Sequence, residues 1–256
     1  MIKLSAVIIT FNESQNIRRC IAALLPIADE IVVIDAFSTD DTQKICLEKG
    51  VRLIQHPFEN YGKQKGFASQ QAQYPYILSV DADEVVSDTL KKSIVVVKKN
   101  WIYDGYTFNR LTFYCGKPIR HGDWYPDRKL RLFDKRMGEW NKAVLHDKVV
   151  MKKEATIGHL TGDLLHYSFP SIQMHLQKVM TYTAKESKAA YEEGKDVKPW
   201  HFIVNPIWKF FSYYLLKGGF RDGWAGFTIA VISSYSTFIK YAQTYALQKR
   251  NEKNPH

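Results

Sequence analysis

The chain has 256 residues, of which 45% are hydrophobic, and it carries a formal net charge of +10 at pH 7. This length and composition allow one large globular domain, alone or with an appendage, and the lack of repeats and low-complexity tracts excludes solenoid and linker-rich architectures. The positive charge indicates an anionic partner. Nucleic acid is not expected, because the sequence has no helix-turn-helix, zinc-finger or RNP-like motif.

The first hundred residues alternate between strand and helix patterns. Continuous apolar runs rich in β-branched residues predict buried strands, and apolar residues at helical spacing predict helices between them. We expect strands at 4–10, 30–34, 51–55 and 76–80, and helices at 14–25, 39–49, 62–73 and 87–99. This alternation is typical of a mainly parallel α/β sheet, in which ligands bind at the carboxyl ends of the strands.

The pattern changes after residue 104. Residues 105–151 contain short apolar segments with turn residues and many Tyr, Trp and Arg side chains, which predicts an antiparallel extension of the sheet. Helices are expected at 171–193, 200–216 and 224–247. We therefore predict a nucleotide-binding and catalytic domain at 1–168 and a C-terminal α-helical region at 169–256.

The last two predicted helices are rich in aromatic residues, and 224–239 contains 16 residues without a charge. That segment is shorter than the roughly 20 apolar residues that a membrane span needs. Two interpretations stay open: the helices form a core or a homodimer interface, or they lie in the membrane interface between basic flanks.

The cellular compartment is expected to be the cytoplasm, with or without peripheral contact at the inner membrane. The N-terminal apolar run is short and lacks a cleavage site typical of signal peptides. Cys20, Cys46 and Cys115 are odd in number and widely spaced, so we expect small core thiols in a reducing environment and no disulfide framework.

Three acidic residues, Asp81, Asp83 and Glu84, follow the fourth predicted strand. The carboxylates of Asp81 and Asp83, separated only by Ala82, repel each other unless a cation lies between them. Mg²⁺ and Mn²⁺ prefer oxygen ligands and are often completed by substrate phosphates, where they neutralise charge on a departing diphosphate. The motif therefore predicts a divalent-metal site that phosphate oxygens of a substrate complete.

Acidic residues also follow the first and second predicted strands. Asp35 can accept hydrogen bonds from a ribose or a nucleobase. Glu13 either contacts a nucleotide or simply favours the first turn of a helix. The sequence has no glycine-rich dinucleotide or P-loop motif, which argues against those two kinds of nucleotide site.

The segments Ala6–Glu13, Val33–Thr42 and Ser79–Glu84 resemble, in order, the signatures of family 2 inverting glycosyltransferases with the GT-A fold. Other segments are similar to a bacterial subgroup that includes lipopolysaccharide core β-glucosyltransferases: Gly122–Phe133, Val144–Asp147, Gly162–Ser168 and Lys217–Gly226. The resemblance implies transfer of a hexose from a nucleotide-diphosphate sugar such as UDP-glucose to a lipopolysaccharide-core or other cell-surface glycan.

The resemblance also implies roles for individual residues. It implies that Thr10, Asn12 and Glu13 border the nucleobase, that Asp35 contacts the base or ribose, and that Asp81 and Asp83 hold the diphosphate. It implies that Asp83 is the principal metal ligand, with Asp81 and the late His166 as further candidates. Lys63 or Lys65 is expected to reach a phosphate, although Gly66 stands where the family often has Asn. Arg128 and Arg131 are expected either to neutralise phosphate or to lie on an exposed strand face.

Inversion needs a base that takes the proton of the acceptor hydroxyl. The resemblance implies that this acid follows the metal motif, and it offers Asp127 as the preferred candidate and Asp147 as the second. Two other functions stay open. A sugar-phosphate nucleotidyltransferase would usually have a glycine-rich basic loop after strand one, which the sequence lacks, and a non-catalytic glycan-binding or scaffold protein would not need the acidic residues.

Overall fold

The structure is a computed structural model that describes residues 1–141 and 147–253, with side chains through residue 250. Two compact units make up the chain. The first contains residues 1–111 and 127–166, and the second contains residues 112–126 and 167–256. The boundary predicted from the sequence, between residues 168 and 169, assigns residues 112–126 to the first domain. In the structure these residues belong to the second, helical unit.

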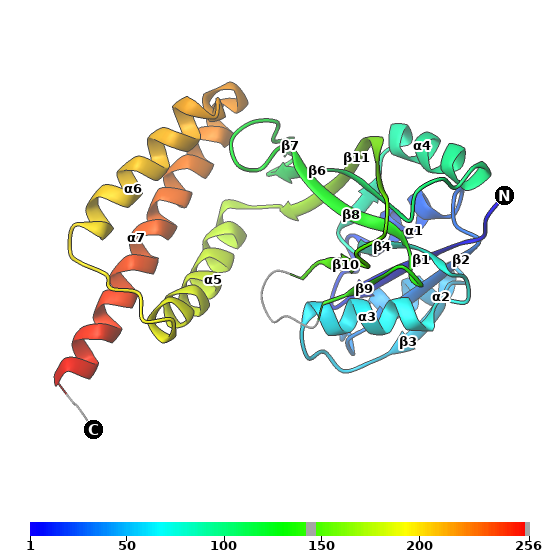
Figure 1. Cartoon of the computed structure of the whole chain (residues 1–256), viewed down its shortest axis with the longest axis horizontal. Coiled ribbons are helices and arrows are strands. Elements are labelled where there is room, and N and C mark those ends of the chain that lie inside the picture. Colours follow the sequence, from blue (N-terminus) through cyan, green and yellow to red (C-terminus); the bar gives the residue numbers. More distant parts are fainter. Residues whose placement is uncertain (142–146, 254–256) are drawn as a thin grey trace. The chain divides into compact units, whose positions relative to one another are not determined.

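The first unit is built on a mixed sheet whose strand order is β3-β2-β1-β4-β8-β6-β11-β5, with β7 paired to β6 (Figure 1). The parallel part comprises β1 (Leu4–Thr10), β2 (Glu30–Asp35), β3 (Arg52–Gln55) and β4 (Tyr76–Asp81). The antiparallel part comprises β5 (Glu84–Val86), β6 (Gly105–Tyr114), β7 (Lys117–Pro118), β8 (Asp127–Asp134) and β11 (Ile157–Phe169). The predicted α/β sheet with an antiparallel extension is confirmed.

Alternate residues of the parallel strands enter two separate cores, one on each face of the sheet. One core contains Leu4 and Ile8 and is covered by α1 (Ile17–Leu24), α2 (Thr42–Glu48) and α4 (Asp88–Lys99). The other contains Val7 and Ile9 and is covered by α3 (Tyr61–Gln71) and a small sheet of β9 (Gly138–Trp140) and β10 (Val149–Met151). Burial on both faces explains why these strands are apolar without alternation.

The predicted helices of the first unit are present, with ends that shift by a few residues. Local capping sets two of their starts, since Asn60 accepts a hydrogen bond from Lys63 N and Ser87 accepts one from Leu90 N. The carboxyl ends of β1, β2 and β4 lie together because these strands are neighbours and parallel. Thr10 pairs with Asp35, and Ile9 pairs with Asp81.

The second unit is mostly helical. It contains α5 (Ile172–Glu192), α6 (His201–Phe211) continued by a π-helical turn (Ser212–Leu216), a 3₁₀ turn (Gly219–Asp222) and α7 (Gly223–Lys253). Both α5 and α6 pack beside α7 (Figure 1). Its core surrounds Tyr114 and Tyr213. Within the described part of the chain, none of the helices is both long and apolar enough to pass through a bilayer.

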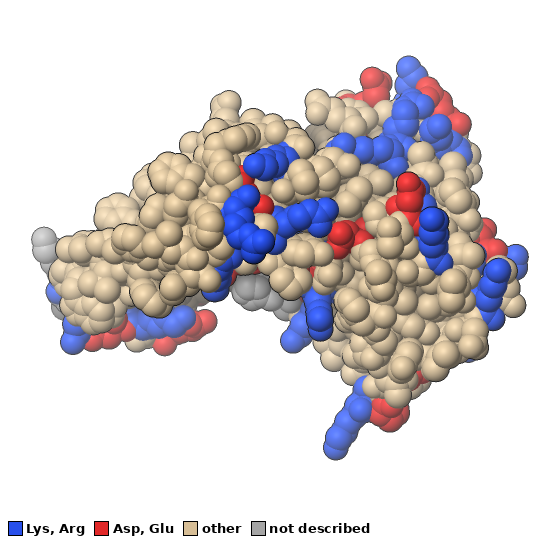
Figure 2. Space-filling view, turned by 90° about the horizontal axis from the view of Figure 1, so that it is seen from above, with Lys and Arg blue, Asp and Glu red and all other residues tan. Residues whose placement is uncertain are grey.

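Large apolar side chains remain exposed along α6 and α7. On α6 they recur at Ile203, Ile207, Trp208 and Phe211, and on α7 at Trp224, Phe227, Val231, Tyr235 and Phe238. Successive members of the α7 set are three or four residues apart, which places them on one face of that helix. Phe210, at the seam between the helices, contacts both Phe211 and Phe227. Figure 2 shows a broad surface without charged side chains over this region, with basic and acidic side chains at its ends.

Candidate active site

The first acid after β4, Asp81, is held by two cations. Lys65 Nζ lies 3.0 Å from Asp81 Oδ1, and Arg131 Nη2 lies 3.3 Å from Asp81 Oδ2. Both cationic side chains are almost fully buried, with 3% and 5% of their surface exposed. Lys65 reaches the site from the sheet-facing side of α3, and the antiparallel pairing of β8 with β4 brings Arg131 beside Asp81.

These contacts decide the charge state of Asp81. Burial alone would raise the pKa of its carboxyl, but the positive charges of Lys65 and Arg131 outweigh burial and hold the pKa well below its usual range. Asp81 therefore remains ionised at neutral pH, and Arg131 Nη1 is a buried donor without a hydrogen-bond partner, in a guanidinium group that lies over the ring of Trp140.

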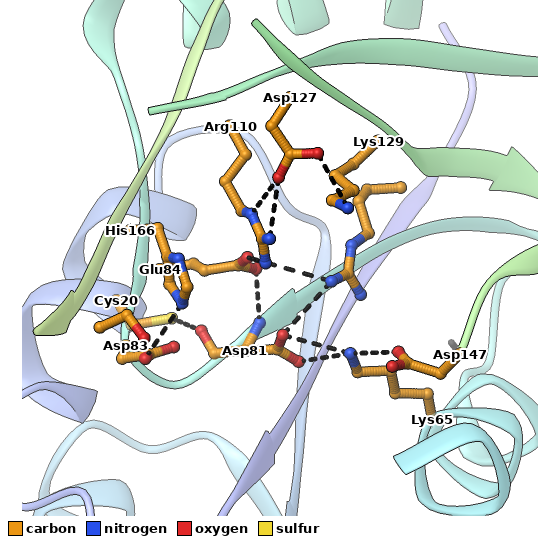
Figure 3. A network of polar contacts seen from close by, with 12 residues as sticks. Cys20, Lys65, Asp81, Asp83, Glu84, Arg110, Asp127, Lys129, Asp147 and His166 are labelled. Carbon is orange, nitrogen blue, oxygen red and sulfur yellow. Dashed lines mark hydrogen bonds and ion pairs between the residues drawn. The ribbon is translucent and has the colours of Figure 1, made fainter. Parts of the chain in front are cut away.

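The second acid of the motif, Asp83, lies beside His166, with 3.3 Å between Asp83 Oδ2 and His166 Nε2 (Figure 3). Strand register causes this proximity, because β11 pairs with β5 so that His166 lies opposite Glu84. A carboxylate is a ligand for Mg²⁺ and Mn²⁺ in sites that substrate oxygens complete, whereas an imidazole is a ligand for divalent transition metals. Among the described residues, no group of three His, Cys, Asp or Glu side chains could hold a metal.

The third acid, Glu84, is completely buried. Its Oε2 accepts a hydrogen bond from Asp81 N, and its Oε1 lies 3.6 Å from Arg110 Nη1 and 4.0 Å from Arg131 Nη2. The two guanidinium groups compensate the buried charge of Glu84. Glu84 thus fixes the turn that follows β4 and aligns the cations around Asp81.

Asp127, the preferred candidate base, lies on the far side of Arg110 from Glu84 (Figure 3). Its carboxylate lies 2.8 Å from Arg110 Nη2 and 2.9 Å from Lys129 Nζ. Side chains alternate along β8, so Asp127, Lys129 and Arg131 share one face, whereas Arg128 is exposed on the other. The structure therefore brings Arg131 into the network and leaves Arg128 out of it.

Asp147, the second candidate base, shares a cation with Asp81. Lys65 Nζ lies 2.8 Å from Asp147 Oδ2 and 3.0 Å from Asp81 Oδ1, so a single ammonium group joins the two carboxylates. About a quarter of each carboxylate side chain is exposed, 23% for Asp81 and 26% for Asp147. Asp147 is thus the candidate base more directly linked to the motif after β4. The preceding Val144, Leu145 and His146 of the family-like segment lie outside the described residues.

The residues expected around a nucleobase lie at the ends of β1 and β2. Asp35 is fully buried, and its carboxylate accepts hydrogen bonds from Ser38 and from Gln43 Nε2. Asn12 Oδ1 accepts a bond from Thr39 N, and Glu13 Oε2 accepts one from Asn16 Nδ2. Thr10 Oγ1 is buried without a hydrogen-bond partner. Asp35 and Asn12 therefore shape the loops, and Thr10 keeps an unused polar atom at this edge.

The remaining predicted residues are placed differently. Ala82 is buried between the two aspartates, and Lys63 is exposed in an ion pair with Glu59. Lys65, which the sequence offered only as the alternative to Lys63, is the lysine in the network. Sequence reasoning gave no role to Arg110, and the signal that could have found it is its position on a strand that pairs with β8, in the register Arg110 opposite Asp127.

Comparisons with known proteins identify the family of the chain. The family model described as glycosyl transferase family 2 matches residues 5–153, more than half of the chain. An uncharacterized glycosyltransferase of Rickettsia typhi is 30% identical, with 98% of this chain and 90% of the relative covered. The lipopolysaccharide core biosynthesis glycosyltransferase LpsC of Rhizobium meliloti is 28% identical, with 94% and 92% covered.

Solved structures give more distant matches. Glucosyl-3-phosphoglycerate synthase of Mycobacterium tuberculosis, crystallised with Mn²⁺, UDP and phosphoglyceric acid, aligns with a TM-score of 0.37 and 20% identity over 44% of this chain and 43% of that one. TarS of S. aureus aligns with a TM-score of 0.44 and 17% identity over 72% and 39%. The family model and the near full-length relatives carry the assignment: the chain belongs to glycosyltransferase family 2.

Proposed function

We propose that the protein is a metal-dependent inverting glycosyltransferase that moves a hexose from a nucleotide-diphosphate sugar to a lipopolysaccharide-core or other cell-surface glycan. The observation that carries the proposal is the pair of Asp83 and His166, set at the carboxyl edge of the parallel sheet beside the cation-bound Asp81. A carboxylate and an imidazole side by side support binding of a metal and a diphosphate, because substrate oxygens commonly complete such sites.

Asp83 and His166 would hold the divalent cation, Mg²⁺ or Mn²⁺. When bound, it would supply positive charge against the diphosphate as the glycosidic bond breaks. We assign a different task to Asp81, because Lys65 and Arg131 already form ion pairs with its carboxylate. The unused Nη1 of Arg131 supports a role in binding a phosphate oxygen, and Thr10 Oγ1 supports a polar contact to the nucleoside.

The acceptor class rests on the relatives. LpsC carries lipopolysaccharide core biosynthesis in its name and matches almost the whole chain, which supports a glycolipid or glycan acceptor. The first test is release of nucleoside diphosphate from a panel of UDP-, GDP- and dTDP-sugars with Mn²⁺, Mg²⁺ or EDTA. Hydrolysis of one donor that EDTA abolishes supports the proposal. Metal-independent binding of glycans without donor turnover would point to the non-catalytic alternative instead.

The base is assigned by comparing two substitutions. Asp127→Asn and Asp147→Asn each remove one candidate proton acceptor while keeping the size of the side chain. Loss of the base is expected to lower the transfer rate by about 10²- to 10⁴-fold without weakening donor binding. The measurement is kcat for transfer alongside donor affinity. The sequence favours Asp127 as the base. A fall in kcat confined to Asp147→Asn would assign the base to Asp147 instead. Native kcat in both variants would exclude both residues as the base.

We also propose that the exposed apolar faces of α6 and α7 lie on an anionic membrane surface. The segment from 200 to 239 contains three Lys or Arg residues, Lys209, Lys217 and Arg221, and its one acid, Asp222, is 4% exposed. Lys209 and Lys217 also pair with Asp123, which leaves a net charge of +1 among Asp123 and these two lysines. An amphipathic surface with aromatic side chains and a basic edge fits a bilayer of anionic lipids, where the apolar rings enter the acyl boundary. A second copy of the chain is the competing occupant.

The membrane proposal is tested by sedimentation with vesicles of phosphatidylcholine alone or mixed with phosphatidylglycerol. Trp208→Ser combined with Leu216→Ser removes two side chains that are 63% and 71% exposed, and vesicle affinity is expected to fall by about a hundredfold. Leu47→Ser with Ile102→Ser, each 67% exposed in the first unit, is the matched control and should change nothing. Dimerisation without vesicle binding would contradict the proposal and favour the second copy.

A further inference from the structure

Phe37 adopts a backbone conformation that its side chain disfavours. Its φ angle is +60°, in the left-handed region where a side chain clashes with the backbone and where Gly is the usual residue. The ring is also 51% exposed. A strained backbone with a ring left in water lowers stability, and residues of this kind concentrate at ligand-binding sites.

The position of Phe37 is fixed by its neighbours. Ala36 N donates to Thr10 O, and Ser38 Oγ accepts a hydrogen bond from Asn12 N, so both flanking residues are tied to the loop that follows β1. Ser38 also donates from N and Oγ to the buried carboxylate of Asp35. These bonds hold the turn in its strained form, and they hold Phe37 at the carboxyl edge of the parallel strands.

A second exposed ring comes from the loop to which this turn is bonded. Phe11 is 56% exposed and lies between Thr10 and Asn12, the two residues that bond the turn of Phe37. Two apolar rings and the unpartnered hydroxyl of Thr10 thus occupy the edge where α/β sheets bind nucleotides. A flat, partly polar heterocycle has the chemistry that this combination would recognise.

We propose that Phe37 binds the nucleobase of the donor by stacking, and that the strained turn serves to present its ring. This inference rests on the proposed nucleotide-diphosphate sugar donor. Stacking depends on an aromatic plane, so a Leu of similar bulk would retain the strain and lose the function. Gly would relieve the strain and also lose the function.

The experiment measures UDP affinity by calorimetry in the presence of Mn²⁺ for the native protein and for Phe37→Gly, Phe37→Leu and Phe37→Tyr. The Gly and Leu variants are expected to bind UDP about tenfold more weakly, and the Tyr variant to match the native protein. Thermal unfolding is expected to give a Tm for Phe37→Gly that is equal to or above the native value, because Gly adopts φ +60° freely.

Pyrophosphate with Mn²⁺ serves as the ligand without a base, and its affinity should be the same in all four proteins. Cys115→Gly is the matched control for the backbone, because it also removes a side chain from a residue with positive φ, +48°, in the second unit. The UDP affinity of this variant should equal the native value. Equal UDP affinity in the native, Gly and Leu proteins, or a loss in Phe37→Tyr, overturns the inference. Failure of the native protein to bind any nucleoside diphosphate would instead remove the proposed donor site itself.

Discussion

Replacement of Asp83 by Asn is expected to lower the rate of donor turnover by more than about a hundredfold, because the metal would lose its charged ligand and several kcal/mol of transition-state stabilisation. The pairing of Asp83 with His166 at 3.3 Å is the reason for choosing this residue over Asp81, whose carboxylate is already bound by cations. The measurement is nucleoside diphosphate release from the preferred sugar nucleotide across a Mn²⁺ titration.

The matched control is Asp88→Asn, which neutralises a carboxylate that is 91% exposed at the start of α4. It should leave turnover and metal dependence unchanged. His166→Asn is expected to raise the Mn²⁺ concentration needed for half-maximal turnover by about 10- to 100-fold, with smaller loss at saturating metal. Native turnover in Asp83→Asn would contradict the metal assignment while leaving the family membership intact.

Replacement of Lys65 by Met is expected to lower the free energy of unfolding at pH 7 by about 2–4 kcal/mol. The substitution removes the buried ammonium group that pairs with the carboxylates of Asp81 and Asp147. Met keeps the length of the apolar stem, and the low end of the range reflects the partial exposure of Asp81 and Asp147. Lys63→Met, two residues earlier on the same helix, changes an exposed surface ion pair and should be nearly neutral. Urea unfolding monitored by tryptophan fluorescence gives both values.

The Lys65 effect should depend on pH in a defined direction. The folded-state pKa of Asp81 is held below its usual range by Lys65 and Arg131 against the opposing effect of burial. A depressed carboxyl pKa contributes stability that is present above its unfolded value, about 4, and is lost as pH falls toward the folded value. The difference between native and Lys65→Met should therefore be largest near neutral pH and shrink below pH 4. A constant difference across that window would exclude the Asp81 contact as its source.

Strong local patterns predicted the parallel half of the fold correctly. The apolar runs that begin at Leu4, Glu30 and Tyr76 became β1, β2 and β4 with the expected starts, because each strand is buried on both faces and cannot tolerate polar alternation. For the antiparallel half, the sequence predicted an extension of the sheet but not the bounds of its individual strands. Neither β5 nor β11 was identified, since β5 is three residues long and β11 mixes Gly, His and Asp with apolar residues.

Tertiary pairing also reassigned residues 112–126. Their sequence continues the strand-rich segment, yet the buried carboxylate of Asp222 accepts bonds from the backbone N–H groups of Arg120 and His121. Gly122 lies so close to Tyr213 that an added Cβ would be 2.3 Å from its ring. Contacts over about a hundred positions in sequence leave no local pattern, so composition could not reveal them.

The sequence by itself determined the family, the α/β class and the acidic motif after the fourth strand, because buried strands and short-range motifs are encoded by adjacent residues. Only the tertiary structure decided which charges meet. It placed Lys65 rather than Lys63 between Asp81 and Asp147. It also gave the two aspartates of the motif different partners, because cations bind Asp81 and His166 contacts Asp83. These partnerships depend on helix facing and on strand register, in which a shift of one residue turns every side chain to the opposite face.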